Sequence, residues 1–292
     1  MIDLHMHTTA SDGRLSPQEL VDLAVRSGLK AIAITDHDAV SGIAQASEHA
    51  KRGALEVIPG IEINCAEKKL GFSEIEVVGL FINPENKNIA GFARAAKLDR
   101  IEQKKKSVKK LQRLGFEISF EELKSRAKGS LGFPHIAGLL LEKYPEKFSS
   151  IKDVFDKYLR AGKPAFVDRQ KKPGIKQAIS IIKKSGGLAF LAHPGIFSRE
   201  DSLRAINFFQ GSKGDGIETY YPYHLICSEK KISEKENLAL INFFRGTAKS
   251  LGLLESGGSD FHGGDRQTIN AVGIPDSVLE KLRESLKRRL VK

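Results

Sequence analysis

The sequence predicts an α/β fold that is interrupted by a mostly helical segment. Short apolar runs alternate with stretches of helical periodicity, which is the pattern of repeated strand–helix units. Between about residues 92 and 165 the alternation stops, and apolar positions fall at helical spacing among many lysines. The chain has 292 residues, 40% of them hydrophobic and 28% charged, which suits one α/β domain that carries an insertion.

The expected strands are short and rich in apolar residues. They cover residues 2–7, 31–34, 57–63, 74–81, 188–192, 216–220 and 253–256, with a further strand at 164–167. After the first strand, Ser16, Pro17 and Glu19 predict a helix that starts with a capping box and stops at Gly28. Residues 277–290 predict an amphipathic, basic terminal helix that packs on the domain. The resulting division is an α/β domain in two parts, 1–95 and 166–292, with a helical insertion at 96–165.

Composition bears on location and on the class of partner. The formal net charge of +11 favours polyanionic partners such as nucleotides, although a solvated basic surface explains it equally well. Cys65 and Cys227 lie far apart without a zinc-binding or disulfide spacing, which favours a reducing compartment. Neither a secretory signal nor an apolar stretch of about 20 residues is present. We therefore expect a cytoplasmic location, no membrane association and no obligate protein partner.

Acidic residues and histidines follow the predicted strands. His5 and His7 are two residues apart, so on a strand both side chains leave the same face. Taken singly, such a pair is more often a surface feature, and an Asp-Gly pair is more often a turn. Several of these patterns occur together, however, and strand ends converge on one mouth in barrel-like folds. The sequence therefore predicts a metal site built from His5, His7, Asp12, His37, Glu62, His193, Asp260 and His262.

Five motifs in this chain resemble those of the PHP (polymerase and histidinol phosphatase) family. They are DLHMHTTASDG at 3–13, ITDHD at 34–38, PGIEI at 59–63, AHP at 192–194 and GSDFHG at 258–263. The resemblance spans nearly the whole chain, and the first motif is highly specific. It implies a distorted (β/α)7 barrel with a trinuclear metal centre at the strand C-termini.

Residues 96–167 further resemble a stand-alone subgroup of the family. This subgroup includes 3′,5′-nucleoside bisphosphate phosphatases that also act as 5′→3′ exonucleases on short RNA. By this resemblance, His5, His7, Glu62 and Asp260 hold one metal ion, and Glu62 bridges to a second ion that His193 also binds. The third ion is held by Asp12, His37 and His262.

Two positions depart from the family pattern. Glu76 stands where the family often has His, so it is either a ligand or a salt-bridge partner beside a two-metal site. Phe133 stands where Arg is usual, which removes one phosphate contact. The nearby His135 is a candidate ligand or substrate contact, and packing within the insertion is an equal alternative.

The expected activity is hydrolysis of phosphate esters of nucleotides by water that metal ions activate. Histidine and carboxylate ligands without thiolate favour Mn²⁺, Fe²⁺ or Zn²⁺, with Mg²⁺ as a further option. His135 or His224 is the expected proton donor, and Lys163 and Arg199 are the expected phosphate contacts. The alternatives are a phosphatase for a small metabolite such as histidinol phosphate, a C–N hydrolase and a non-catalytic metal-binding module.

Overall fold

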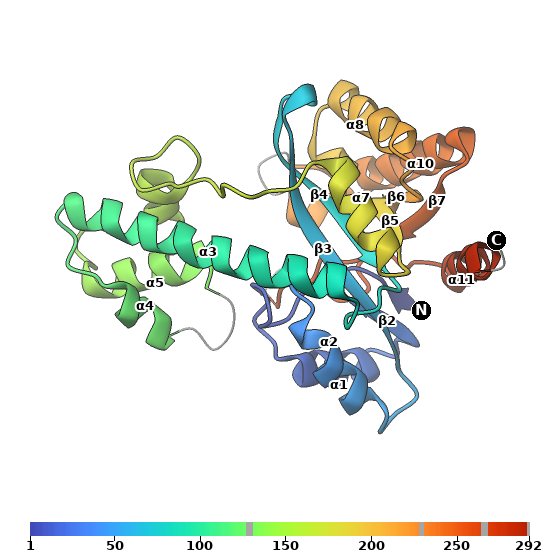
Figure 1. The fold of residues 1–292 in the computed structure, drawn as a ribbon, viewed down its shortest axis with the longest axis horizontal. Coiled ribbons are helices and arrows are strands. Elements are labelled where there is room, and N and C mark those ends of the chain that lie inside the picture. Colours follow the sequence, from blue (N-terminus) through green and yellow to red (C-terminus); the bar gives the residue numbers. More distant parts are fainter. Residues whose placement is uncertain (127–130, 228–230, 264–267, 291–292) are drawn as a thin grey trace. The chain divides into compact units, whose positions relative to one another are not determined.

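The computed structural model describes residues 1–126, 131–227, 231–263 and 268–290. The chain forms two compact units (Figure 1). The first comprises Met1–Ala93 and Pro173–Lys292, and the second comprises Arg94–Lys172. No helix in the described ranges combines the length and the apolar character that crossing a membrane requires.

The first unit is built on a seven-stranded sheet whose strands follow each other in chain order. All neighbouring strands are parallel except at β4, which runs antiparallel to both β3 and β5. The predicted α/β class is confirmed. The strands are β1 (Ile2–Asp3), β2 (Ala31–Ile34), β3 (Glu56–Glu67), β4 (Phe72–Leu80), β5 (Leu188–Leu191), β6 (Gly216–Tyr220) and β7 (Leu254–Gly257).

Strands β3 and β4 form a long hairpin. The 3₁₀ turn η1 (Lys68–Leu70) and Gly71, at φ 80°, join them, and so short a connection requires antiparallel strands. β3 therefore continues to Glu67 instead of ending near Ile63 as predicted. Glu62 consequently lies in the middle of this strand, paired with Val78, and not at its end.

The first strand is shorter than predicted, because the chain beyond Asp3 bonds to the segment that follows β7. The backbone N–H of Leu4 donates to the carbonyl of Gly257 at 3.2 Å, and that of His7 donates to Phe261 at 2.9 Å. In return, the N–H of Asp260 donates to the carbonyl of His5 at 2.9 Å. The first and last segments of the sheet therefore lie side by side.

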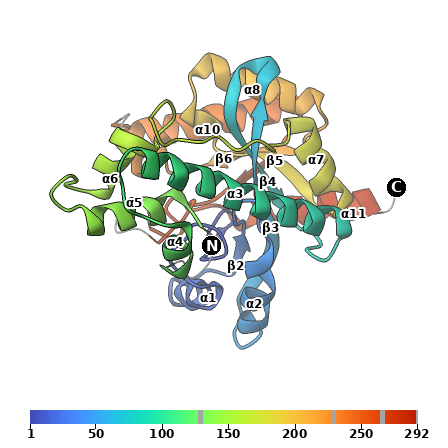
Figure 2. The ribbon, with the colours of Figure 1, turned by 60° about the vertical axis from the view of Figure 1, so that its left-hand side comes forward.

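Helices cover the sheet of the first unit. Helices α1 and α2 lie next to each other near β2, whereas α8 and α10 lie near β6 (Figures 1 and 2). The capping box at Ser16 is confirmed, since Glu19 N–H donates to its hydroxyl at 3.2 Å and Glu19 Oε2 accepts from its N–H at 2.7 Å. The helices are α1 (Pro17–Arg26), α2 (Ser41–Ala50), α7 (Ile175–Lys184), η3 (Pro194–Ile196), α8 (Arg199–Gly211), α9 (Tyr223–Ile226), α10 (Glu234–Leu251) and α11 (Asp276–Leu290).

Two apolar clusters pack on opposite faces of the sheet, as the period of two along a strand requires. On β2, Ile32 and Ile34 belong to one cluster, and Ala31 and Ala33 belong to the other. The predicted terminal helix, α11, packs on the second cluster and contributes Val278, Leu279 and Leu282 to it. Burial on both faces holds the strands rigidly, so the residues that follow them are fixed in space.

The second unit is helical in its described residues and has an apolar core of its own. Helix α3 (Lys87–Arg113) begins in the first unit and enters the second at Arg94. It is followed by α4 (Phe120–Arg126), α5 (Phe133–Lys143), α6 (Ile151–Val154) and the π turn η2 (Phe155–Leu159). The strand predicted at 164–167 is wrong, because Pro164 and Ala165 lie in a turn, where Ala165 N–H donates to the carbonyl of Tyr158, and the next two residues form no regular element.

Candidate metal centre

The first group of candidate ligands brings together residues that follow the first and last strands of the sheet, with one residue of β3. His5 and His7 follow β1, and their Nε2 atoms lie 3.1 Å apart. His7 Nε2 is also 3.1 Å from Asp260 Oδ1, and His5 Nε2 is 3.3 Å from Glu62 Oε2. One donor atom from each of these four residues falls within 4.8 Å of every other, close enough for one metal ion to be shared.

The second group shares His7 and adds the loops after β1, β2 and β7. It consists of His7, Asp12, His37 and His262, again with donor atoms within 4.8 Å of one another. Asp12 Oδ1 lies 3.3 Å from His262 Nε2, and Asp12 Oδ2 lies 3.8 Å from His37 Nε2. The rings of His7 and His262 stack with their centroids 4.0 Å apart.

The third group combines Glu62 and Glu76 of the β3–β4 hairpin with His37, which follows β2. His37, Glu62 and Glu76 have donor atoms within 4.8 Å of one another. Glu76 Oε1 is 3.5 Å from His37 Nδ1, and Glu76 Oε2 is 3.3 Å from His193 Nε2. Glu62 Oε1 also lies 3.1 Å from His193 Nε2. Glu62 therefore contacts members of every group.

Several of these buried atoms have no hydrogen-bond partner, which tests whether a metal ion fits. His37 Nδ1 and Glu62 Oε2 lie 3.0 Å apart, yet each lacks hydrogen-bond geometry to any described group. The buried Nδ1 atoms of His7 and His193 also lack a hydrogen-bond partner among the described residues. A buried polar atom without a partner costs free energy, and a divalent cation would satisfy such converging nitrogen and oxygen lone pairs. The residues fit metal ions.

The pKa values of the metal-free site show how strongly its charges interact. Burial lowers the pKa of His5, but the carboxylates of Glu218 and Glu62 outweigh burial and hold it well above its usual value. Burial lowers the pKa of His262, but the neighbouring Asp12 carboxylate raises it, and the net result is a pKa of about 9. By contrast, burial and the neighbouring His262 reduce the pKa of His7 to about 4. Protonated histidines thus supply positive charge among the carboxylates when no metal does.

Sequence reasoning missed Glu218, a fully buried residue of β6. Its Oε1 lies 2.8 Å from His5 Nδ1, and its Oε2 accepts a hydrogen bond from the backbone N–H of His193 at 2.8 Å. Because the carboxylate accepts the Nδ1 proton, the Nε2 lone pair of His5 faces the other ligands. The available signal was a single carboxylate within an otherwise uncharged, buried strand, GIETY.

Two further supporting residues were also missed. The hydroxyl of Tyr221 donates to Asp260 Oδ2 at 2.7 Å. The buried Asp36 accepts from Thr8 N–H at 2.7 Å and from the Ser11 hydroxyl at 2.6 Å, and so holds the loop that carries Asp12. These contacts fix candidate ligands in place from outside the cluster.

The backbone is strained at two candidate ligands. His193 has φ 25° and Asp260 has φ 52°, in the region that residues with a Cβ rarely adopt. Such conformations persist where the surrounding structure enforces them, and they concentrate at functional sites.

The remaining predicted site residues lie outside this cluster. His224, on α9, is half-buried, and its Nδ1 has no hydrogen-bond partner among the described residues. Arg199, at the start of α8, places its guanidinium 4.3 Å from the ring centre of Phe243. His135 and Lys163 belong to the second unit, where His135 Nδ1 accepts from Gly132 N–H at 3.1 Å and Lys163 is exposed.

A mostly parallel sheet that gathers histidines and carboxylates from distant strands defines an α/β protein with a cluster that could hold metal ions. This chain belongs to the PHP family, because the PHP domain pattern matches residues 3–170. The resemblance found in the motifs is thereby confirmed.

Characterised relatives cover most of the chain. It is 36% identical over 266 residues to the 5′-3′ exoribonuclease Rnm of Escherichia coli (strain K12), which covers 89% of this chain and 84% of that protein. It is 31% identical to the 3′,5′-nucleoside bisphosphate phosphatase of Chromobacterium violaceum, over 89% of this chain and 87% of that protein. A solved structure described as an amidohydrolase from Chromobacterium violaceum, with bound sulfate, superposes with a TM-score of 0.78 at 28% identity, covering 97% and 96% of the two chains.

Proposed function

We propose that this protein is a metal-dependent hydrolase that cleaves phosphate esters of nucleotides, namely 3′,5′-nucleoside bisphosphates and short RNA from the 5′ end. The observation that carries the proposal is the three-group cluster of histidines and carboxylates, with Glu62 contacting members of each group. Relatives named as a 5′-3′ exoribonuclease and a 3′,5′-nucleoside bisphosphate phosphatase support the substrate class.

The three groups suggest how metal ions are distributed in the proposed enzyme. His5, His7, Glu62 and Asp260 would hold one ion, and Glu62 together with His193 would hold a second. Asp12, His37 and His262 would hold a third, and Glu76, which lies near His193 and His37, would contribute to the second or the third. Nitrogen and oxygen donors without thiolate favour Mn²⁺, Fe²⁺ or Zn²⁺, with Mg²⁺ as a further option.

Divalent ions held by these residues would lower the pKa of water towards about 7 and so would supply a nucleophile at neutral pH. The chain's own residues orient the ligands, as Glu218 does for His5. His224 and His135 are the candidate proton donors to the leaving oxygen, and Lys163 and Arg199 are the candidate contacts for substrate phosphate.

We further propose that the sheet closes into a distorted (β/α)7 barrel. The backbone hydrogen bonds from Leu4 to Gly257 and from His7 to Phe261 support closure, because they link the first and last segments of the sheet. In this arrangement residues 96–165 form a helical insertion between two barrel parts, 1–95 and 166–292. The compact second unit supports that division.

Phosphate release under defined metal conditions tests the function. Protein loaded with Mn²⁺ should release phosphate from adenosine 3′,5′-bisphosphate and shorten a labelled RNA from its 5′ end, with far less release from histidinol phosphate. Preference for histidinol phosphate would contradict the nucleotide proposal. Activity on amides but on no phosphate ester, or no hydrolysis at all with metals bound, would contradict the phosphoesterase proposal.

Substitution of candidate ligands tests the site. Asp12→Ala and His193→Ala should each lower kcat about a hundredfold or more, in the range that loss of metal-centred catalysis costs. The surface pair Asp22 and His49, which lie 2.8 Å apart, provides matched controls. Asp22→Ala and His49→Ala should retain the activity. Equal activity in all four variants would remove Asp12 and His193 from the metal centre.

A further inference from the structure

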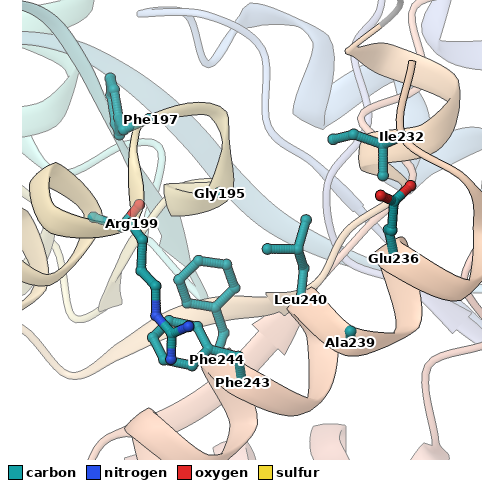
Figure 3. Close-up of a pocket in the computed structure, with 10 residues that line it drawn as sticks. Gly195, Phe197, Arg199, Ile232, Glu236, Ala239, Leu240, Phe243 and Phe244 are labelled. Atoms are coloured by element: carbon teal, nitrogen blue, oxygen red, sulfur yellow. The ribbon is translucent and has the colours of Figure 1, made fainter. Parts of the chain in front are cut away.

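A pocket of about 410 Å³ lies between the segment after β5 and helix α10 (Figure 3). We refer to it as the rim pocket. It is lined mainly by apolar side chains, with Arg199 and Glu236 as its charged members. Figure 3 shows Arg199 reaching from α8 towards Phe243 on α10. Its apolar lining includes Phe197, Ile232, Leu240, Phe243 and Phe244.

One wall of the rim pocket belongs to the chain segment that follows the candidate ligand His193. Gly195, which lines the pocket, comes two residues after the candidate ligand His193. Its N–H donates to the hydroxyl of Tyr223 at 3.0 Å, and a Cβ here would lie 2.6 Å from the Tyr223 ring. The Tyr223 ring packs at 4.7 Å on Tyr221, whose hydroxyl donates to Asp260. The rim pocket therefore adjoins the segment that carries the candidate ligand His193, with the buried Tyr221 and Tyr223 packed beneath that segment.

The chemistry of the lining suits a flat, aromatic group attached to an anion. Leu240 and Phe243 are only partly buried, so they leave apolar surface exposed in the pocket. The Arg199 guanidinium lies 4.3 Å from the centre of the Phe243 ring. Glu236 already bonds to Ser233 at the start of α10. Arginine planes and aromatic rings are the surfaces on which proteins stack unpaired bases, and the guanidinium also attracts phosphate.

We propose that the rim pocket binds a base of the RNA strand beyond the nucleotide at the metal centre. This inference rests on the proposed function. The pocket would be occupied when RNA is the substrate and would stay empty when the substrate is a single nucleotide. A 3′,5′-nucleoside bisphosphate has only one base, whereas an oligonucleotide carries further bases past the cleaved ester. Base stacking is tolerant of sequence, so the pocket holds the strand without selecting one base.

The first test measures RNA binding in the absence of catalysis. Fluorescence anisotropy with a labelled six-nucleotide RNA, in the presence of a chelator, avoids hydrolysis. Phe243→Ala and Arg199→Ala should weaken binding about 5- to 100-fold, as expected for the loss of one stacked base. Phe243→Leu retains apolar bulk without the ring and should weaken binding as well. Lys249→Ala removes an exposed cation from the other end of α10 and is the charge control. An equal loss in the control, or none in the Phe243 variants, would overturn the proposal.

The second test compares two substrates of the metal-loaded protein. In the Phe243 variants, kcat/KM for the six-nucleotide RNA should fall about 5- to 100-fold relative to kcat/KM for adenosine 3′,5′-bisphosphate. A parallel fall for both substrates would show a general defect and contradict a base site. If the unsubstituted protein hydrolyses neither substrate, the proposed function fails, while the anisotropy result still decides whether the rim pocket binds RNA.

Discussion

Two buried glutamates in the same sheet illustrate how surroundings determine a residue's role. Glu62 faces imidazole nitrogens of His5, His7 and His37 at 3.0–3.4 Å, and its Oε2 has no hydrogen-bond donor. Glu218 faces two N–H groups, and both of its oxygens accept hydrogen bonds. The unsatisfied lone pairs of Glu62 suit it to bind a metal ion. The oxygens of Glu218 already accept hydrogen bonds, so its role is to orient candidate ligands such as His5.

Replacing Glu218 by Gln should weaken metal binding without removing a ligand. An amide keeps the shape of the side chain but loses the charge that holds the proton on His5 Nδ1. Loss of such a support typically costs about 10- to 100-fold in metal affinity or activity. Isothermal titration with Mn²⁺ would measure the change. The control is Glu255→Gln on the neighbouring strand β7, since Glu255 pairs with Arg245. Unchanged Mn²⁺ affinity in Glu218→Gln would refute this role.

Metal counting separates the two roles open to Glu76. If Glu76 is a ligand, Glu76→Ala should reduce the number of metal ions per chain, and Glu76→His should restore it, because imidazole can replace the carboxylate. Glu74→Ala is the control, because Glu74 also bonds to Asn64 but lies outside the three ligand groups. Elemental analysis after dialysis gives the metal content. The same metal content in Glu76→Ala and the unsubstituted protein would favour the salt-bridge role.

Sequence patterns identified candidate ligands that lie in recognisable motifs. They did not identify the supporting residues, whose partners are distant in the chain. His5, His7 and Asp12 lie in one short motif, and strand periodicity places both histidines on one face. Glu218, by contrast, contacts His5 across 213 positions of the chain, and Tyr221 contacts Asp260 across 39. No local pattern encodes such partners. Only the completed fold brings them together.

Among the secondary-structure elements, the apolar pattern of the sequence predicted where strands lie, but it did not predict the direction in which they run. The runs that form β2, β5 and β6 were located correctly because fully buried strands need continuous apolar residues. The antiparallel direction of β4 depends on the tight turn at Lys68–Gly71, which the sequence reasoning did not identify. The resemblance to the family implied a barrel, and the hydrogen bonds between the segments after β1 and β7 are compatible with that expectation, but local patterning could not specify them because they join residues more than 250 positions apart.

A methyl group added at Gly258 tests the junction between those two segments. A Cβ at this position would lie 2.3 Å from the Cβ of His5 and 2.4 Å from its backbone nitrogen. Gly258→Ala should therefore push the segments apart and displace both His5 and Asp260. We expect a loss of about 1–3 kcal/mol in the free energy of unfolding and weaker Mn²⁺ binding. Urea denaturation and metal titration measure the two effects.

The matched control for this change is Gly246→Ala. Gly246 lies inside α10, and a Cβ there would meet nothing within 4 Å. This variant should gain about 0.4–1 kcal/mol, because alanine restricts the unfolded chain and favours the helix. If Gly258→Ala were as stable as the unsubstituted protein and bound Mn²⁺ equally well, the junction would not position the ligands.

For the whole molecule, the proposed metal ions would compete with protons for the same side chains. The carboxylates hold the pKa values of His5, His37 and His193 well above the usual 6.5, although burial opposes this. Such groups stabilise the metal-free fold fully below pH 6.5, and this contribution is lost as pH rises through their folded pKa values. The depressed pKa of Glu62 acts in the opposite direction, since its contribution is present above about pH 4.5 and is lost in acid.

Removing metal should therefore destabilise the protein more at high pH than at low pH. At pH 6 the metal-free site retains protonated histidines, which balance Glu62 and its neighbouring carboxylates. At pH 9 part of the positive charge of His262, whose pKa is about 9, is lost, whereas bound ions would still neutralise the carboxylates. Metal binding must also displace these protons, so its affinity rises with pH. Thermal denaturation with Mn²⁺ or with a chelator should show a Tm difference that grows from pH 6 to pH 9. Glu62→Gln should reduce that difference at both pH values, and a Tm difference independent of pH would contradict the competition.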